Sequence, residues 1–267
     1  MRHAIHLVAV AAVIVALPIL AAGPGTRFGL WDYAAGLGMI RGVSTPKAVF
    51  GGLSVSPLFF IAGLSLALGA AGFFTRNARA GVLAVAAAAF AFALGVIPLK
   101  MKAAIESNPF IHEITTDFDN PPAIVAAAGQ ERVNPADYRG GDPVPRRDDG
   151  QTVAEAQREA FPDIRPLVIQ RDLKTAADLS LSVIKSMGMD VLAEGPADNA
   201  VGGGWRIEAV ATSFWFGFKD DFVVRLTMVD GGATRIDIRS KSRVGKSDLG
   251  ANAARVREFE ARFRAKI

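Results

Sequence analysis

Three long apolar segments limit what this chain can fold into. Residues 5–22, 56–74 and 80–99 contain no Asp, Glu, Lys or Arg. Because a helix rises about 1.5 Å per residue, each segment comes close to the ~30 Å thickness of a bilayer core. The whole chain is 51% hydrophobic, which is too apolar for an ordinary soluble domain. We therefore predict a membrane domain over residues 1–102 with three transmembrane helices.

The flanks of these segments add detail. Arg76 and Arg79 lie in the short turn between the second and third segments, so these two are expected to form a helical hairpin. Small residues such as Gly63 and Gly69 would let the helices approach closely. The first segment ends in LAAG, which also fits a cleaved signal peptide, although it is longer than the usual signal core of about 7 to 15 residues. Residues 23–54 mix aromatic and basic residues, which predicts an interfacial loop.

The basic residues give two answers about orientation. With the N-terminus in the cytoplasm, three basic residues lie inside and five outside, so a plain count favours the reverse. The dense positive charge of the TRNAR turn and the MRH start favour an N-terminus inside. We therefore expect a multi-pass protein of a bacterial inner membrane with its C-terminal domain on the periplasmic side. The basic residues of the predicted membrane domain are Arg2, Arg27, Arg41, Lys47, Arg76, Arg79, Lys100 and Lys102.

Charge is distributed unevenly along the chain. Residues 1–102 hold eight basic residues and one acid, Asp32, whereas residues 103–267 hold the other 22 basic and 25 acidic residues. The pI of about 9.6 therefore comes from the membrane half and gives no argument for nucleic-acid binding. The chain has no cysteine, so disulfides, thiolate metal sites and a cysteine nucleophile are excluded. No cofactor motif is recognised.

The remaining sequence predicts an irregular connector and a small domain. Residues 103–171 are rich in Pro, Gly and Asp, which indicates an extended segment along the surface. Thr152 and Glu155 form a capping box for a short helix over residues 153–160.

From 172 to 267 the periodicity is regular. A helix is expected from the Thr175 and Asp178 box to Gly188, and a final helix from about Asp248. Strands are expected at 189–193, 205–213, 222–230 and 234–241.

These elements predict the fold class α+β, a two-layer domain in which two helices cover one face of a four-stranded antiparallel sheet. The loop Asp230, Gly231, Gly232 is typical of a tight hairpin. A register that pairs Leu226 with Ile236 would place Arg225 opposite Asp237. The second face of the sheet would then be polar, either a solvated surface or a binding surface. Its residues are Glu208, Thr212, Arg225, Asp237 and Arg239.

Three short motifs suggest chemistry. Gly245, Lys246 and Ser247 resemble part of a phosphate-binding loop, but Ser240 stands where such a loop requires glycine. Ser247 or Asp248 at a helix start, with basic residues nearby, could still hold an anionic group. The cluster from His112 to Asp119 lacks the spacing of a calcium loop, so we expect no metal. The run FWFGFKDDF at 214–222 has more rings than one strand face can bury, which favours a core cap, a pocket lip or a membrane-touching loop.

The C-terminal part resembles a known family. IHEITTDFDNPP, FPDIRPL, IEAVATSFWFGFKDD and RIDIRSKSRVGKSDLGANAARVREF occur in the order found in domain of unknown function 1499. The resemblance covers about residues 108–265. It implies an exported or membrane-tethered protein, and it supplies no activity, cofactor or catalytic residue. It directs attention to polar positions, namely Thr115, Thr116, Asp117, Lys219, Asp220, Asp221, Arg239, Ser240, Ser242, Arg243, Ser247, Asp248 and Asn252.

The leading hypothesis is a membrane-anchored, non-enzymatic module that binds an anionic or amphiphilic small molecule, a lipid or a protein partner. The first alternative is a hydrolase in which Asp220, Asp221 or Asp237 acts as acid or base. Lys246 or Arg243 would stabilise negative charge in this hydrolase. The second is a structural or assembly subunit of a membrane complex. The candidate ligand-binding residues are Asp117, Lys219, Asp220, Asp221, Arg239, Lys241, Arg243, Lys246, Ser247 and Asp248.

Overall fold

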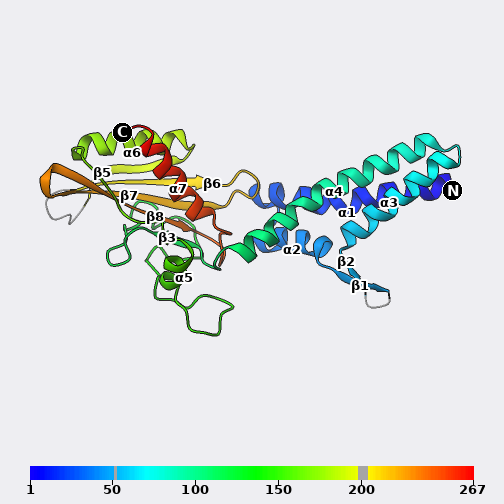
Figure 1. The fold of residues 1–267 in the computed structure, drawn as a ribbon, viewed down its shortest axis with the longest axis horizontal. Helices are drawn as coiled ribbons and strands as arrows, with labels where there is room; N and C mark the ends of the chain where they lie inside the picture. The colour runs from blue at the N-terminus through cyan, green and yellow to red at the C-terminus, as the bar shows by residue number, and fades with distance from the viewer. Residues whose placement is uncertain (51–52, 198–203) are drawn as a thin grey trace. The chain divides into compact units, whose positions relative to one another are not determined.

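The computed structural model describes residues 1–50, 53–197 and 204–267. It contains two compact units. Unit 1 comprises Met1–Ala103 together with the short segment Phe214–Gly217, and unit 2 comprises Ala104–Ser213 together with Phe218–Ile267. The helices of unit 1 and the sheet of unit 2 are labelled in Figure 1.

Unit 1 is mainly helical. Its long helices are α1 (Arg2–Arg27), α3 (Pro57–Phe74) and α4 (Ala78–Ser107), whose last turn belongs to unit 2. All three are long and apolar enough to cross a membrane. Helices α1 and α4 contain the predicted segments 5–22 and 80–99 and extend beyond both ends of each, whereas α3 begins one residue later than the predicted segment 56–74 and ends with it.

The stretch between the first two long helices is more regular than the predicted interfacial loop. It contains α2 (Tyr33–Ser44) and a hairpin of β1 (Lys47–Phe50) and β2 (Leu53–Val55). Helix α2 begins after Asp32, whose Oδ1 accepts a hydrogen bond from the Ala35 amide at 2.7 Å. This N-cap was overlooked in the sequence because glycines interrupt the apolar pattern that follows it.

Small residues bring α3 and α4 together. A Cβ on Gly81 would lie 2.7 Å from the Gly69 carbonyl oxygen, so the two backbones meet where neither residue has a side chain. Nearby, the Ser65 hydroxyl donates to the Ala84 carbonyl at 2.9 Å. Gly63, also expected at a helix contact, faces open space.

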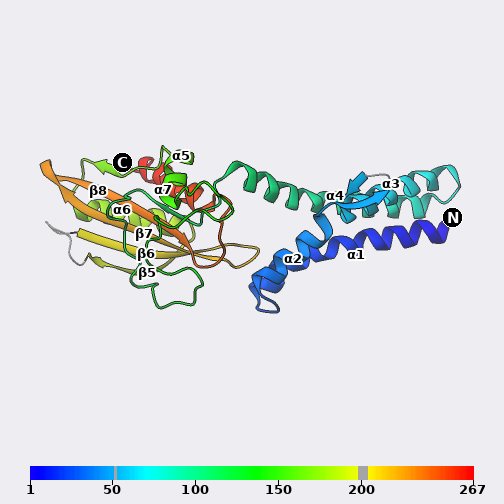
Figure 2. The ribbon, with the colours of Figure 1, turned by 90° about the horizontal axis from the view of Figure 1, so that it is seen from below.

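Unit 2 is an α+β domain whose sheet has six strands, not the four predicted. The order is β3-β8-β7-β6-β5, with β4 also paired to β8, and all the pairs are antiparallel. Figure 2 shows the long strands side by side. The strands are β3 (Glu113–Thr115), β4 (Leu167–Ile169), β5 (Asp190–Pro196), β6 (Gly204–Thr212), β7 (Lys219–Val229) and β8 (Ala233–Ser242).

The two missed strands lie in the segment predicted as an irregular connector. Strands β3 and β4 have three residues each, too short for an alternating pattern to stand out. They pair with successive parts of β8, so that one long strand supports both. The predicted hairpin register is confirmed, because Leu226 pairs with Ile236 and Arg225 with Asp237. The turn between them is the short 3-10 helix η1 (Asp230–Gly232).

Three helices complete unit 2. Helix α5 (Val153–Ala160) has the predicted capping box of Thr152 and Glu155. Helix α6 (Leu173–Ser186) begins one turn earlier than predicted, because Asp172 accepts a hydrogen bond from the Thr175 amide at 2.9 Å. Helix α7 (Ala251–Arg264) begins later than predicted, after Gly250. Helices α6 and α7 pack on the apolar side of the sheet, where Phe222, Phe259 and Phe263 are buried and in ring contact.

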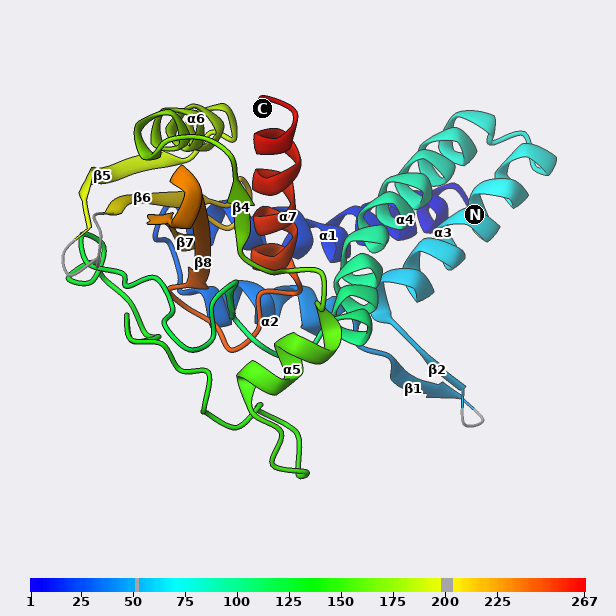
Figure 3. The ribbon, with the colours of Figure 1, turned by 60° about the vertical axis from the view of Figure 1, so that its left-hand side comes forward.

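The other side of the sheet is also covered, contrary to the prediction of an exposed polar face. Figure 3 shows the irregular chain that follows β3 lying on the side of the sheet opposite α6. Ile124 and Ala127 of this segment pack on Val223. The Glu208 carboxylate, 1% exposed, accepts hydrogen bonds from the Val125 and Ala127 amides at 3.0 and 3.2 Å. Periodicity did not reveal this layer because the covering segment is not a regular element. Its backbone amides bond partly to the Glu208 side chain and partly to backbone carbonyls such as that of Arg243.

Candidate functional site

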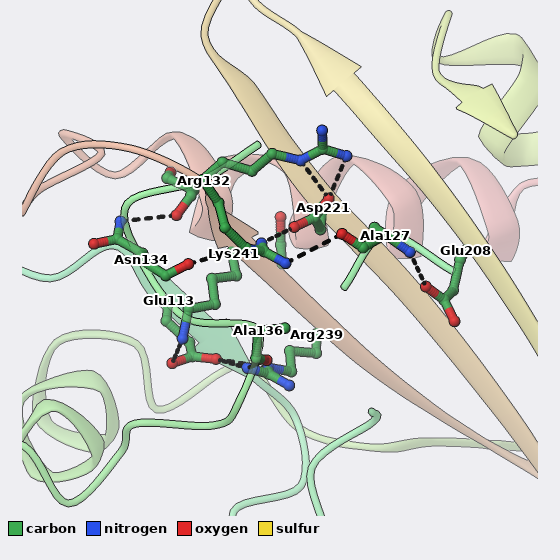
Figure 4. Close-up of polar contacts among 12 residues, drawn as sticks. Glu113, Ala127, Arg132, Asn134, Ala136, Glu208, Asp221, Arg239 and Lys241 are labelled. Atoms are coloured by element: carbon green, nitrogen blue, oxygen red, sulfur yellow. Dashed lines mark hydrogen bonds and ion pairs between the residues drawn. The ribbon is translucent and has the colours of Figure 1, made fainter. Parts of the chain in front are cut away.

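The face beneath the irregular segment holds a buried network of ion pairs, part of which is drawn in Figure 4. Glu113 of β3 lies between Arg239 and Lys241 of β8, and all three side chains are at most 2% exposed. Arg239 Nε donates to Glu113 Oε1 at 2.6 Å, and Lys241 Nζ donates to Glu113 Oε2 at 2.9 Å. The remaining donors reach carbonyl oxygens of Pro122, Ala136 and Asp137. One carboxylate therefore binds two cations that the alternation of side chains along β8 places on the same face.

A second cluster lies near the start of β7. Asp221, 1% exposed, pairs with Arg243 at 2.8 Å and with Arg132 of the irregular segment. Asn134 fixes that segment, since its amide donates to the Ser242 and Gly245 carbonyls at 2.9 and 2.8 Å. The Asp221 cluster thus holds the covering chain against the sheet.

A third cluster surrounds Asp237. Arg225 donates to Asp237 and Asp117 at 2.9 Å, and Arg235 contacts the same two acids at about 3 Å. Asp237 is buried, whereas Arg235 is partly exposed. Asp117 also accepts hydrogen bonds from the Asp119 and Asn120 amides, so it helps to turn the chain after β3.

On the helix side of the sheet, a polar cluster replaces the apolar core near the start of α7. Arg255 donates to Asp220 at 2.7 Å and to the Ser240 hydroxyl at 3.0 Å. Asn252 donates to the Ser242 hydroxyl at 3.0 Å. Asp248 accepts hydrogen bonds from the Gly250 and Asn252 amides, each at 2.9 Å, so it organises the start of the helix without being its N-cap residue.

The predicted site residues therefore do not meet at one concavity. Asp117, Asp221, Arg239, Lys241 and Arg243 belong to three ion-pair clusters on one side of the sheet. Asp220 and Asp248 lie on the other side with α7, in accordance with the alternation of side chains along a strand. The exposed candidates are Lys219 and Lys246, and Ser247 is half-buried. Ser247 accepts a hydrogen bond from the Leu249 amide at 3.3 Å.

Burial shifts the titration of three groups here. Burial lowers the pKa of the Lys241 amino group, although the negative charge of Glu113 opposes the shift. Burial, followed by the positive charge of Lys241, lowers the pKa of the His112 imidazole. Burial raises the pKa of the Asp248 carboxyl, against the lowering effect of its hydrogen bonds to Asn252 and Gly250. The Lys241 side chain is fully buried, whereas His112 and Asp248 are partly exposed.

The carboxylates considered for hydrolysis are also paired. Asp220, Asp221 and Asp237 each accept hydrogen bonds from arginine. Glu113 and Asp117, considered as metal ligands in the sequence, bind Arg and Lys side chains. Withdrawing one partner from such a buried pair leaves an uncompensated charge at a cost of about 3–5 kcal/mol. These clusters are therefore better suited to holding unit 2 together than to releasing a group for chemistry.

Arg146, a basic residue that forms no ion pair among the described residues, lies beside the end of α4. A pocket of about 250 Å³ is lined by Ile105, Asn108, Pro109, Phe110, Val144, Pro145, Arg146, Arg147 and Gln151. The Arg146 guanidinium lies over the Phe110 ring, 4.3 Å from its centroid. Among the residues that the structure describes, no carboxylate lies within ion-pair distance of Arg146. Its neighbour Arg147 is paired with Asp149.

Arg146 also has an unusual backbone. Its φ of 69° lies in the left-handed region, which non-glycine residues seldom adopt. The motif PVPRRDDG contains this residue, but sequence reasoning treated it only as connector. The sequence shows there only a pair of arginines directly after Pro145, and the position of Arg146 beside Phe110 depends on the fold.

A second cavity, of about 300 Å³, lies where α7 meets the ends of α6 and β6. It is lined by Met187, Met189, Ala211, Ala251, Ala254, Arg255 and Glu258. Both charged residues are already engaged, Arg255 with Asp220 and Glu258 with Arg262. Because both charges already have partners, this cavity is a weaker candidate for an ion-binding site than the Arg146 pocket.

Comparison with known proteins agrees with the resemblance found in the sequence. The family model described as "Protein of unknown function (DUF1499)" matches residues 113–263. This range begins with β3 and ends within α7, so it covers every strand of the unit 2 sheet. A search of the curated proteins found no match. Because the model matches more than half of the chain, this protein is a member of the DUF1499 family.

Proposed function

We propose that this protein is an integral membrane protein whose unit 2 binds the phosphate group of an anionic amphiphile, in particular a phospholipid, in the Arg146 pocket. We further propose that it resides in a bacterial inner membrane, with unit 2 on the periplasmic side. The proposal rests on the environment of Arg146. This cation has no ion-pair partner in the described residues, is stacked on Phe110 and lines a pocket.

The chemistry of Arg146 supports a phosphate ligand. A guanidinium presents a planar set of N–H donors that matches two oxygens of a phosphate group. Its stacking on Phe110 restrains the side chain while the N–H donors stay at the rim of the plane. Lys219 and Lys246, the exposed candidates from the sequence, have no comparable pocket among those described.

The walls of the pocket support an amphiphile over a small polar anion. Ile105, Phe110, Val144 and Pro145 supply apolar surface beside the arginine. Helix α4 has 30 residues, about 45 Å at 1.5 Å per residue, which exceeds the ~30 Å core of a bilayer. Its last turns, which carry Ile105, therefore extend past the core into the layer where lipid phosphates lie.

The site differs from the one expected from the sequence, whose candidates include Arg239 and Arg243. These two arginines are paired with Glu113 and Asp221 inside unit 2. A ligand would have to displace these acids, whereas it would only add to the contacts of Arg146.

The test uses the full chain in detergent. Short-chain phosphatidylglycerol, short-chain phosphatidylcholine and inorganic phosphate are added separately, and binding is followed by thermal unfolding and native mass spectrometry. We expect phosphatidylglycerol to bind best. Arg146→Gln should weaken that binding about ten-fold, the ~1.4 kcal/mol expected for a charge-assisted hydrogen bond. Arg165→Gln, which removes another exposed arginine, should have no effect.

Equal binding of the two lipids, or unchanged binding by Arg146→Gln, would contradict the proposal. Inorganic phosphate that binds as well as phosphatidylglycerol would show an anion site that does not require acyl chains, and would exclude a lipid ligand.

A further inference from the structure

Unit 1 has an exposed apolar patch at the C-terminal end of α1. It consists of Phe28, Leu30 and Phe214, which are 75%, 73% and 92% exposed, and we call it the aromatic patch. Phe28 and Leu30 directly follow α1, and Phe214 belongs to the segment Phe214–Gly217 that unit 1 includes. Large exposed apolar side chains that gather in one place mark an interaction surface.

The neighbours of Phe214 hold it in this exposed position. Arg27 Nη1 donates to the Phe214 carbonyl at 2.8 Å. Trp215 packs against the apolar cluster of the long helices, and its ring lies so close to Gly23 that a Cβ there would be 2.1 Å from it. Phe216 is buried and touches Trp215, with the ring centroids 5.7 Å apart. The rings of Trp215 and Phe216 therefore fix the turn, and the Phe214 ring is left exposed.

The patch continues the apolar surface of α1. Leu7, Val10, Ile14 and Leu17 are exposed at helical spacing, and Phe28 extends the same row at the end of the helix. If α1 crosses the membrane, as proposed above, this row faces acyl chains. The patch then lies where the apolar core gives way to head groups, the layer in which aromatic side chains and a basic residue such as Arg27 are favoured.

We infer that the aromatic patch inserts into the interfacial layer of the phospholipid bilayer, so that the turn at Phe214 is a membrane contact in addition to the helices. This contact rests on α1 spanning the membrane but not on the ligand proposed for Arg146.

The absence of cysteine allows a direct test. Single variants Phe214→Cys, Phe28→Cys, Ile14→Cys and Met228→Cys are labelled with an environment-sensitive dye in the full chain, in nanodiscs. Ile14 reports the middle of α1, and Met228, 51% exposed, reports a residue at the opposite end of β7 from the turn that contains Phe214. Quenching is compared between lipids with a doxyl group near the head group and lipids with one deep in the acyl chain.

We expect dyes at 214 and 28 to show blue-shifted emission and stronger quenching by the shallow group than by the deep one. The dye at 14 should be quenched most by the deep group, and the dye at 228 should behave as in water. If the dye at 14 is quenched but the dye at 214 resembles that at 228, or is shielded without quenching, the inference is wrong. Absence of quenching at 14 would refute the span itself, and with it the contact.

Discussion

At the scale of single residues, unit 2 depends on carboxylates that each hold more than one cation. Glu113 binds Arg239 and Lys241, and Asp221 binds Arg132 and Arg243. Burying such charges costs several kcal/mol for each ion, so the clusters are stable only while every partner is present. They explain why polar positions that suggest a ligand site in the sequence have a structural role here.

We predict that Glu113→Gln lowers the free energy of unfolding of unit 2 by about 3–5 kcal/mol, because Arg239 and Lys241 would remain buried without a counter-charge. Urea unfolding followed by the fluorescence of Trp205 measures this change. Glu258→Gln is the matched control, since it removes an exposed pair with Arg262 worth less than about 1 kcal/mol. Equal losses in the two variants would show that burial does not decide the strength of these pairs.

At the scale of elements, the edge strand β3 illustrates how a short strand is held. One side of β3 pairs with β8, and its other side is satisfied by a side chain of α5. The Thr115 amide donates to Gln157 Oε1 at 3.0 Å, and Gln157 Nε2 donates to the Thr115 carbonyl at 2.6 Å. The glutamine amide therefore takes the place of a neighbouring strand and closes the sheet edge.

Gln157→Ala should destabilise unit 2 by at least about 1–3 kcal/mol, since the buried N–H and C=O of Thr115 would lose their partners. Hydrogen exchange should also show faster exchange of the Thr115 amide. Gln151→Ala, which removes an exposed glutamine bonded to Glu159, provides the comparison. A stability unchanged from wild type in Gln157→Ala would mean that water replaces the side chain at no cost.

At the scale of the whole molecule, the chain combines an apolar helical unit and a charged α+β unit, each with its own core. The cores differ in kind. Unit 1 packs small residues between helices whose outer surfaces remain apolar, whereas unit 2 buries aromatic and aliphatic side chains on one side of its sheet and ion pairs on the other.

Because each unit has its own core, we predict that they unfold in separate transitions. Trp205 belongs to unit 2, and Trp31 and Trp215 belong to unit 1. In detergent, a variant that retains only Trp205 should show unfolding at a lower urea concentration than one that retains only Trp31. A single transition common to both probes would show that the two units unfold as one.

The apolar helices, the family and much of the sheet could be predicted from the amino-acid sequence, because they follow from local patterns. Uncharged runs, alternation along β6 to β8 and the Asp230–Gly232 turn can each be recognised within a few consecutive residues. The hairpin register followed from the same alternation, and the Thr152 and Glu155 cap from residue type.

The segment that covers the polar face of the sheet could not be predicted in this way and became evident in the folded chain. The contacts between Glu113 and Arg239, or between Arg132 and Asp221, join residues far apart in the chain, and the covering segment has no period of its own. Whether a charged residue meets water, an opposite charge or a pocket is a property of such distant contacts. For that reason Arg239 proved to be buried and paired, while Arg146, in a stretch that looked like plain connector, emerged as the better candidate for a ligand.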